Sequence, residues 1–139
     1  MRFYTKEWFY HCQTAEPGEP QLRQPVEAYS AVRKKQNIPD TLWDKLRYHD
    51  AQLLQIQMKD DGLHLWMEDM GWGNEHLQLV KPDIVLWEEP LTDMVWIYEE
   101  LYRIPAGYEL HVLFQDWKSV RLAELTVRCA DIVIKRQEE

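Results

Sequence analysis

The feature that most restricts the fold is a change of hydrophobic period near residue 51, from a helical repeat to strict alternation. Apolar and polar residues alternate over 54–59 and again over 63–68, on either side of Asp60-Asp61-Gly62. Glycine accepts the positive φ that tight hairpin turns require, so these residues predict a β-hairpin. We expect its core face to be formed by Leu54, Ile56, Met58, Leu63, Leu65 and Met67.

The residues before this hairpin predict helices and loops. Thr5 is a suitable N-cap for a short helix in the aromatic-rich first 13 residues, and a short strand at 2–4 is expected to precede it. The proline-rich residues 15–25 indicate a loop. Pro25 then suits the first position of a helix over 26–36, and Asp40 or Thr41 caps a shorter helix that ends at Tyr48.

The residues after the hairpin continue as strands. Residues 76–81 and 83–87 predict one strand or two pieces around Pro82, followed by a hairpin of 95–104 with 108–114 and by strands at 119–127 and 131–135. The expected fold is α+β in a single domain, 1–139. Its helical portion, 1–48, packs on or beside an antiparallel β-meander of about six or seven strands over 49–136.

Composition excludes several classes of function. The net charge is −8 and the basic clusters are short, so binding to nucleic acid is not expected, whereas an acidic surface suits a basic partner protein. Cys12 and Cys129 lack CxxC spacing, and no phosphate-binding loop or other cofactor motif is present, so no cofactor is expected. With no signal-peptide core and no apolar run of about 18 residues, we expect a cytoplasmic protein that does not bind membranes.

His49-Asp50 is the first candidate for chemistry, at the junction of the helical and strand-rich parts. The pair has the residue types of a metal site or an acid–base couple. The structural alternative, which we favour, is that His49 or Asp50 satisfies backbone groups at a helix-to-strand junction.

Further histidines and carboxylates alternate on predicted strands. His64, Trp66 and Glu68 are expected on the outward face of the hairpin, and Glu109 and His111 on that of another strand. If these strands are neighbours, the side chains form a metal patch; otherwise they form the solvated face that antiparallel sheets usually present. Glu99 and Glu100 are strand neighbours that should point to opposite faces, which argues against a shared catalytic site.

Tryptophans are the remaining signal, with seven in 139 residues. Trp72 lies between two glycines on a predicted loop, where it either contacts a ligand or partner or folds back over the core. Trp66, Trp72 and Trp96 are our hypothetical anchors for a partner protein.

The opening Thr5-Lys6-Glu7-Trp8-Phe9 resembles the T-K-E-W-[YF] signature that begins a family of small bacterial proteins of unknown function. His49-Asp50 before the first hairpin, and the segments 97–102, 107–111 and 125–132, fit the same family. The resemblance implies a bacterial protein but no catalytic residue, because the family has no assigned activity. The strand-rich half is also similar in style to small bacterial immunity proteins, which neutralise a toxin.

These observations favour a non-enzymatic protein-binding module, of which an immunity-type protein is one specific form. The competing class is a metal-dependent enzyme that uses His49 and Asp50 together with His64 and His111. A third alternative is a homodimer formed through an exposed edge strand or aromatic face.

Overall fold

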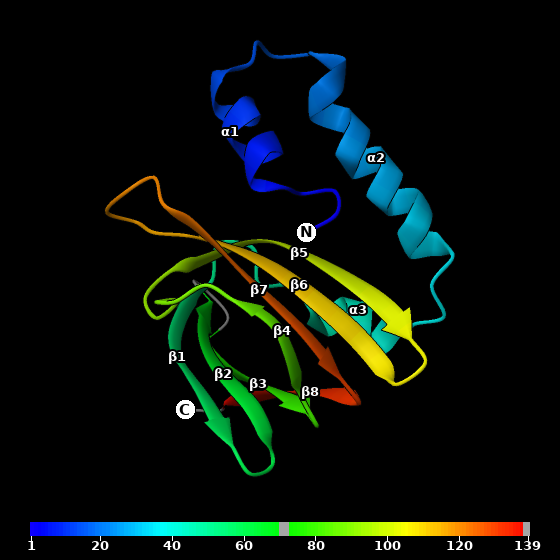
Figure 1. Cartoon of the computed structure of the whole chain (residues 1–139), viewed down its shortest axis with the longest axis vertical. Helices are drawn as coiled ribbons and strands as arrows, with labels where there is room; N and C mark the ends of the chain where they lie inside the picture. The colour runs from blue at the N-terminus through cyan, green and yellow to red at the C-terminus, as the bar shows by residue number, and fades with distance from the viewer. Residues whose placement is uncertain (70–72, 138–139) are drawn as a thin grey trace.

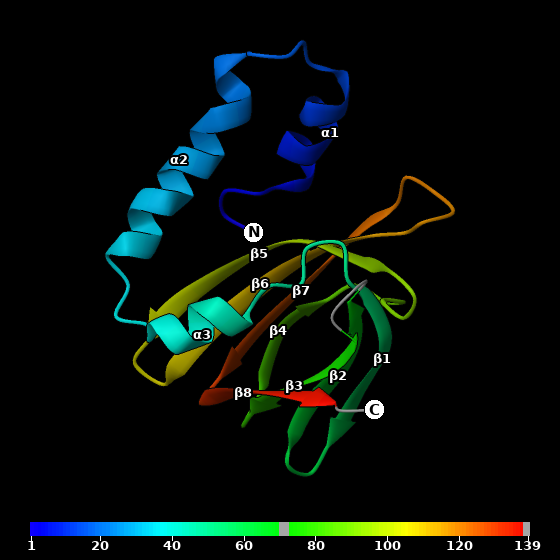
Figure 2. The same ribbon diagram turned by 180° about the vertical axis from the view of Figure 1, so that it is seen from behind.

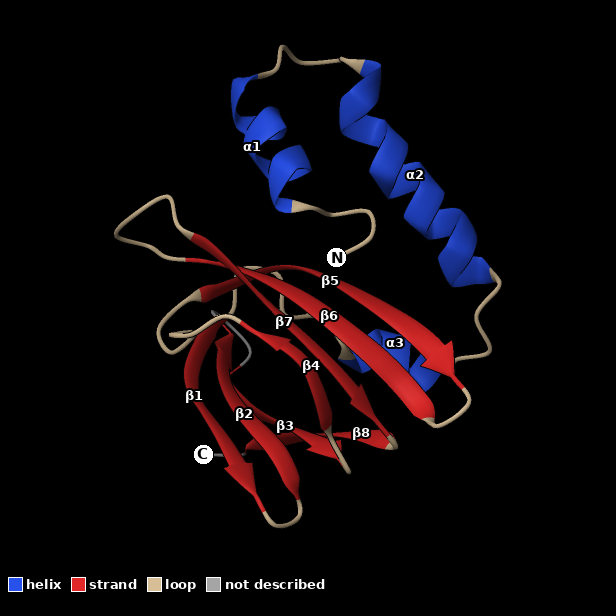
Figure 3. Cartoon of the chain, viewed as in Figure 1, coloured by secondary structure: helices blue, strands red, loops and turns tan. Residues whose placement is uncertain are grey.

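The computed structural model describes residues 1–69 and 73–137 (Figures 1 and 3). In this part of the chain three helices precede eight strands, which confirms the expected α+β class. The elements are α1 (Lys6–Thr14), α2 (Pro20–Lys34), α3 (Asp40–Lys45), β1 (Gln52–Lys59), β2 (Gly62–Asp69), β3 (Gly73–Val80), β4 (Asp83–Trp87), β5 (Val95–Ile104), β6 (Gly107–Gln115), β7 (Leu122–Cys129) and β8 (Asp131–Gln137).

All eight strands form one antiparallel sheet in the order β4-β7-β6-β5-β1-β2-β3-β8. Two three-stranded meanders, β1–β2–β3 and β5–β6–β7, are joined through β1 and β5, and the sheet bends so that the two halves face each other (Figure 1). The strand number is eight rather than six or seven because the segment around Pro82 divides into β3 and β4, which pair with different strands.

The division of β3 from β4 is a bend in one long antiparallel pair. The register of β3 with β8, in which Val80 faces Asp131, continues into that of β4 with β7, in which Asp83 faces Arg128. Lys81 has a positive φ of 50° at the bend, and the Ala130 amide donates to the Val80 carbonyl at 2.8 Å. This bent pair carries the chain from one half of the sheet to the other.

The junction between β1 and β5 is short. Only Gln52 and Val95 pair in register, and further backbone bonds involve Ala51, Leu53 and their neighbours. Beyond that point side chains cap the open edge of β5: the Leu101 amide donates to the Tyr29 hydroxyl, and the Arg103 amide to Gln36 Oε1, both at 2.9 Å. The helical half of the chain thus completes an edge that the sheet leaves open.

The first hairpin is present with its turn at Asp60-Asp61-Gly62, but its core face differs from the expectation at both ends of β1. A bulge between Leu53 and Gln55 lets Leu53, rather than Leu54, pair with Met67 on the core side, where both are fully buried. Ile56 packs against the core as expected, whereas Met58 is 46% exposed beside the turn.

The first helix begins as predicted. Thr5 Oγ1 accepts from the Trp8 amide at 3.1 Å, and Phe9 packs on the outer face of β5 and β6. The expected strand at 2–4 is wrong, because those three amides donate to the Glu100 carboxylate instead of to a neighbouring strand.

The second helix corrects the loop expected at 15–25. It begins at Pro20 and contains Pro25 one turn further on, so Pro20, not Pro25, takes the first-turn position. Proline within a helix removes one backbone hydrogen bond, while Tyr29 further along α2 is buried at the open edge of β5. The third helix packs Leu42 and Trp43 against the core at one end of the sheet (Figure 2).

Among residues 1–69 and 73–137, no helix is both long and apolar enough to cross a membrane.

Candidate functional site

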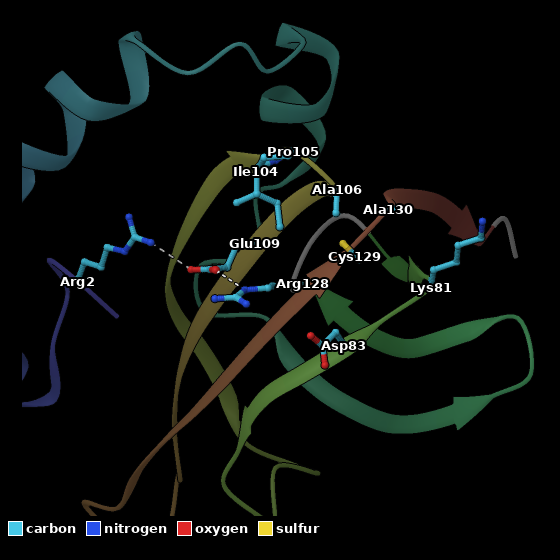
Figure 4. Close-up of a pocket in the computed structure, with 10 residues that line it drawn as sticks. All are labelled: Arg2, Lys81, Asp83, Ile104, Pro105, Ala106, Glu109, Arg128, Cys129 and Ala130. Carbon is cyan, nitrogen blue, oxygen red and sulfur yellow. Dashed lines mark hydrogen bonds and ion pairs between the residues drawn. The ribbon is translucent and has the colours of Figure 1, made fainter.

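A pocket of about 800 Å³ opens where the β5–β6 turn meets the end of β7 (Figure 4). Its apolar wall comes from Ile104, Pro105 and Ala106, and its polar wall contains Glu109 and Arg128. Lys81 and Asp83 line it from the bend between β3 and β4. Charges of both signs therefore face this space.

Glu109 is the centre of the polar wall and is fully paired. It accepts from His111 Nε2 at 2.6 Å, from Arg128 Nε at 2.9 Å and from an Arg2 guanidinium nitrogen at 3.3 Å. Burial acts to raise the pKa of Glu109, but the bonds from Arg128 and His111 outweigh it and lower that pKa. A carboxylate held in this way is suited to positioning its neighbours rather than to exchanging protons.

Thr126, His111 and Glu109 form a row of hydroxyl, imidazole and carboxylate across β7 and β6. Thr126 Oγ1 lies 3.4 Å from His111 Nδ1. The same residue types make a nucleophile, a base and an orienting acid in hydrolases. Here all three are buried, and burial is the largest effect lowering the pKa of His111. Because the hydroxyl is not accessible, we assign this row a role in packing.

Glu100 anchors the first residues of the chain. Its carboxylate accepts from the amides of Arg2, Phe3 and Tyr4 at 2.8–3.0 Å and from the Tyr102 hydroxyl. Although burial acts to raise the pKa of Glu100, these hydrogen bonds lower it. The side chain is 0% exposed, so it is a structural clamp for the N-terminal segment.

A second pocket, of about 470 Å³, lies at the open edge of β5. Glu99 lines it from β5, and the other walls are Tyr29, Arg33, Trp43, Leu46, Arg47 and His49. Glu99 therefore points away from Glu100, as alternation in a strand requires. We call this space the Glu99 pocket.

His49 meets the structural role that the sequence favoured. Its Nδ1 bonds the Ile97 carbonyl at the open edge of β5, and the Asp50 amide donates to Trp96 O at 2.8 Å. The Nε2 of His49 lies 3.6 Å from the exposed Asp50 carboxylate. Within the described ranges, no three histidine, cysteine, aspartate or glutamate side chains are grouped as metal ligands.

His64 is far from His111 in the sheet, because β1 and β5 lie between their strands. The condition for a metal patch, that the two strands are neighbours, is therefore not met. The alternative of a solvated face does not hold for these two histidines either, because both are buried. Instead, His64 Nδ1 lies 2.6 Å from His76 Nε2, and His64 Nε2 lies 2.6 Å from Asp61. The two imidazoles stack with the half-buried Trp66 ring on the outer face of β2 and β3.

The three tryptophans proposed as anchors differ in how far the structure exposes them. Trp96 is 0% exposed and packs against Tyr48 and Phe114, which corrects its expected role as an anchor, since a buried ring does not reach a partner. Trp66 remains partly exposed. Trp72 lies outside the described residues.

Among residues 1–69 and 73–137, the most exposed large aromatic residue is a tryptophan that the sequence reasoning passed over. Trp117 is 67% exposed and Val120 is 75% exposed, at the end of the β6–β7 hairpin. Tyr10 of α1, 45% exposed, donates its hydroxyl to Val120 O at 3.3 Å. We call residues 116–121 the hairpin tip. Two apolar residues spaced by polar Lys118 and Ser119, between two strands, were the signal available in the sequence.

No protein-family model, curated protein or solved structure matches this chain.

Proposed function

We propose that this protein is a non-enzymatic protein-binding module and that the hairpin tip is its principal contact surface. The observation that supports this most strongly is the exposure of Trp117 and Val120 in one short hairpin tip, with the exposed Tyr10 bonded to the Val120 carbonyl. Tryptophan and tyrosine are over-represented among the residues that dominate binding energy in interfaces.

The tip is braced by hydrogen bonds of its own. The Asp116 amide donates to Arg121 O at 3.0 Å, and the Asp116 carboxylate accepts from the Lys118 amide at 3.0 Å and the Ser119 hydroxyl at 3.2 Å. A loop that is already ordered loses little conformational freedom on binding, which favours affinity. The tip also projects beyond the edge of the sheet (Figure 1).

The chemistry of the tip indicates the kind of partner. Trp117 and Val120 fit an apolar groove, and Lys118 between them suits an acidic rim on that groove. The Arg121 guanidinium donates hydrogen bonds to the Pro90 carbonyl at 2.6 Å and to the Met94 sulfur. Lys118 is therefore the cation of the tip that faces outward. We infer a protein partner with an apolar groove bordered by carboxylates.

A site-specific photocrosslinker tests this proposal. Placed at residue 117 in cells that make the protein, it should join one partner, and the same group at the exposed Val26 of α2 should not. With that partner purified, Trp117→Ala should weaken binding by about 30-fold, as expected for the loss of an interface anchor, and Val26→Ala should not. Equal labelling from both positions, or equal affinities of both variants, would overturn the proposal.

Two other occupants of the tip give distinct results. Crosslinking of one copy of this chain to another, with sedimentation that depends on concentration, would replace a foreign partner by a homodimer. Cosedimentation with vesicles of anionic phospholipid, lost in Trp117→Ala, would replace it by a membrane surface. Either result contradicts the proposal.

A further inference from the structure

The Glu99 pocket lies where the sheet is incomplete. Between the short β1–β5 junction and the Tyr29 cap, the edge of β5 is covered by side chains from α2, α3 and the segment that follows α3. Such a gap between elements is a usual place for a small-molecule site. Its volume, about 470 Å³, falls within the range of ligand pockets.

The entrance of this pocket is cationic although the protein is acidic overall. Arg33 stacks its guanidinium over the Trp43 ring at 4.2 Å. Across the described ranges, no carboxylate lies within ion-pair distance of Arg33. Arg47 has an exposed partner, Asp44, at 3.5 Å, which is a weak interaction in water. Arg33 is therefore a fixed guanidinium, oriented by an aromatic ring, whose donors are available to an anion.

The inner end of the pocket is a carboxyl group with one anchored oxygen. Trp96 Nε1 donates to Glu99 Oε2 at 3.1 Å, from an indole that is itself fully buried. This bond holds one oxygen of the carboxyl group against a buried core residue. Burial raises the pKa of Glu99, an effect that the Trp96 bond and the charges of His49 and Arg33 only partly offset.

We propose that the Glu99 pocket binds a small organic anion, a carboxylate or a phosphate monoester, with a flat apolar body. Arg33 pairs with the anionic group, Trp43 and Tyr29 contact the body, and Glu99 hydrogen bonds a polar group at the inner end. Arginine suits both anions because its fork matches their paired oxygens. This site is independent of the hairpin tip and lies on a different side of β5, towards α3 rather than towards α1.

The site should bind anions better as the pH falls, because protonation of Glu99 removes a negative charge from the pocket. The other charged or titratable groups facing it are Arg33 and Tyr29 from α2, and Arg47, His49 and Asp50 from the segment between α3 and β1. The pKa of Tyr29 is raised to about 12 by burial, so its hydroxyl stays neutral throughout this range. Because His49 also faces the pocket, the role of Glu99 needs its own variant.

Calorimetric titration of the whole chain with benzoate, phenyl phosphate and the neutral benzamide tests the proposal. At least one of the anions should bind saturably and benzamide should not, and the stronger anion tells which group the site prefers. Arg33→Gln should weaken binding by about tenfold. The control is Arg23→Gln, which removes the same charge from an exposed position on the same helix and should leave binding unchanged.

The Glu99→Gln variant distinguishes the contribution of the Glu99 carboxyl group to anion binding from that of His49. The variant should bind the anion more tightly than the natural chain at mildly alkaline pH, and should lose most of the pH dependence. Binding of neither anion beyond that of benzamide, equal effects of the Arg33 and Arg23 variants, or weaker binding by Glu99→Gln at alkaline pH would each overturn the proposal. Unfolding curves confirm that each variant is folded before it is titrated.

Discussion

The Tyr29 hydroxyl of α2 accepts a hydrogen bond from the Leu101 amide of β5 at 2.9 Å, and this buried bond joins the helical half of the chain to the open edge of the sheet. The two residues lie 72 positions apart in the sequence. An edge amide without a strand partner normally bonds water. Here a phenol replaces the missing strand, so the sheet and the helices form one structure.

Removal of this hydroxyl should destabilise the protein without emptying much space. Tyr29→Phe leaves the Leu101 amide buried and unsatisfied, which costs about 1–3 kcal/mol. Urea unfolding should show a lower midpoint with an unchanged slope. Tyr10→Phe is the control, because its exposed hydroxyl bonds Val120 O at the surface and should contribute much less. Equal stabilities of the two variants would contradict the role of Tyr29.

Glu100 should hold the N-terminal segment through charge as well as through hydrogen bonds. Glu100→Gln replaces an acceptor of three amides and one hydroxyl by a group with one acceptor oxygen. We expect a loss of about 2–4 kcal/mol, since donors at a buried site are left unpaired. In this variant, amide hydrogen exchange should become faster at residues 2–4 and change less in the strands.

The control for Glu100 is Glu7→Gln at an exposed position of α1, which should leave exchange at residues 2–4 unchanged. The pH dependence of the natural chain has a definite sign. Because the pKa of Glu100 is lower in the folded state, its contribution is present above the pKa of the unfolded chain and is lost as the pH falls through the folded value.

Local sequence patterns were enough for the first hairpin and for the capped first helix. The alternation around Asp60-Asp61-Gly62 and the Thr5 cap act over a few residues, so the sequence carries their signal directly. The bulge at Leu53 and the bend at Lys81 depend on which strand lies opposite, which no local pattern contains. The sequence interpretation therefore failed at positions whose structure depends on pairing with strands far away in the sequence.

The candidate sites were harder to predict for the same reason. His49 was identified from its place at a junction, but Arg33 and Glu99 come from α2 and β5 and meet only in the folded chain. The sequence predicts only that Glu99 and Glu100 point to opposite faces of a strand, since nothing near Glu99 in sequence shows that its carboxyl group bonds to Trp96. The exposure of the Trp117 side chain could not be predicted, because it depends on the length and path of the β6–β7 hairpin in the folded chain.

Gly62 should be far less replaceable than another glycine with a positive φ. Its φ is 137°, and an added Cβ would lie 2.3 Å from Leu79 O. Gly62→Ala should therefore cost more than about 2 kcal/mol, because it strains the turn and pushes β2 away from β3. Gly18 has a φ of 91° with no atom within 4 Å of its Cβ position, so Gly18→Ala tests the backbone cost alone. Thermal unfolding should show a clearly lower midpoint for Gly62→Ala, and equal midpoints would contradict the close approach.

Glu99 should reduce stability at the pH where it is charged, in contrast to Glu100. Its folded pKa is raised by burial, so the folded state holds this proton more tightly than the unfolded chain does. The favourable contribution is therefore present at acid pH and is lost as the pH rises from the unfolded pKa through the raised folded value. Glu99→Gln cannot ionise and should be more stable than the natural chain at mildly alkaline pH, with the gap closing as the pH falls. Urea unfolding at several pH values measures this. Glu27→Gln on the exposed face of α2 should show no stability gap that changes with pH. A variant that is less stable than the natural chain at alkaline pH would show that charged Glu99 is stabilised by Arg33 and His49 rather than opposed by burial.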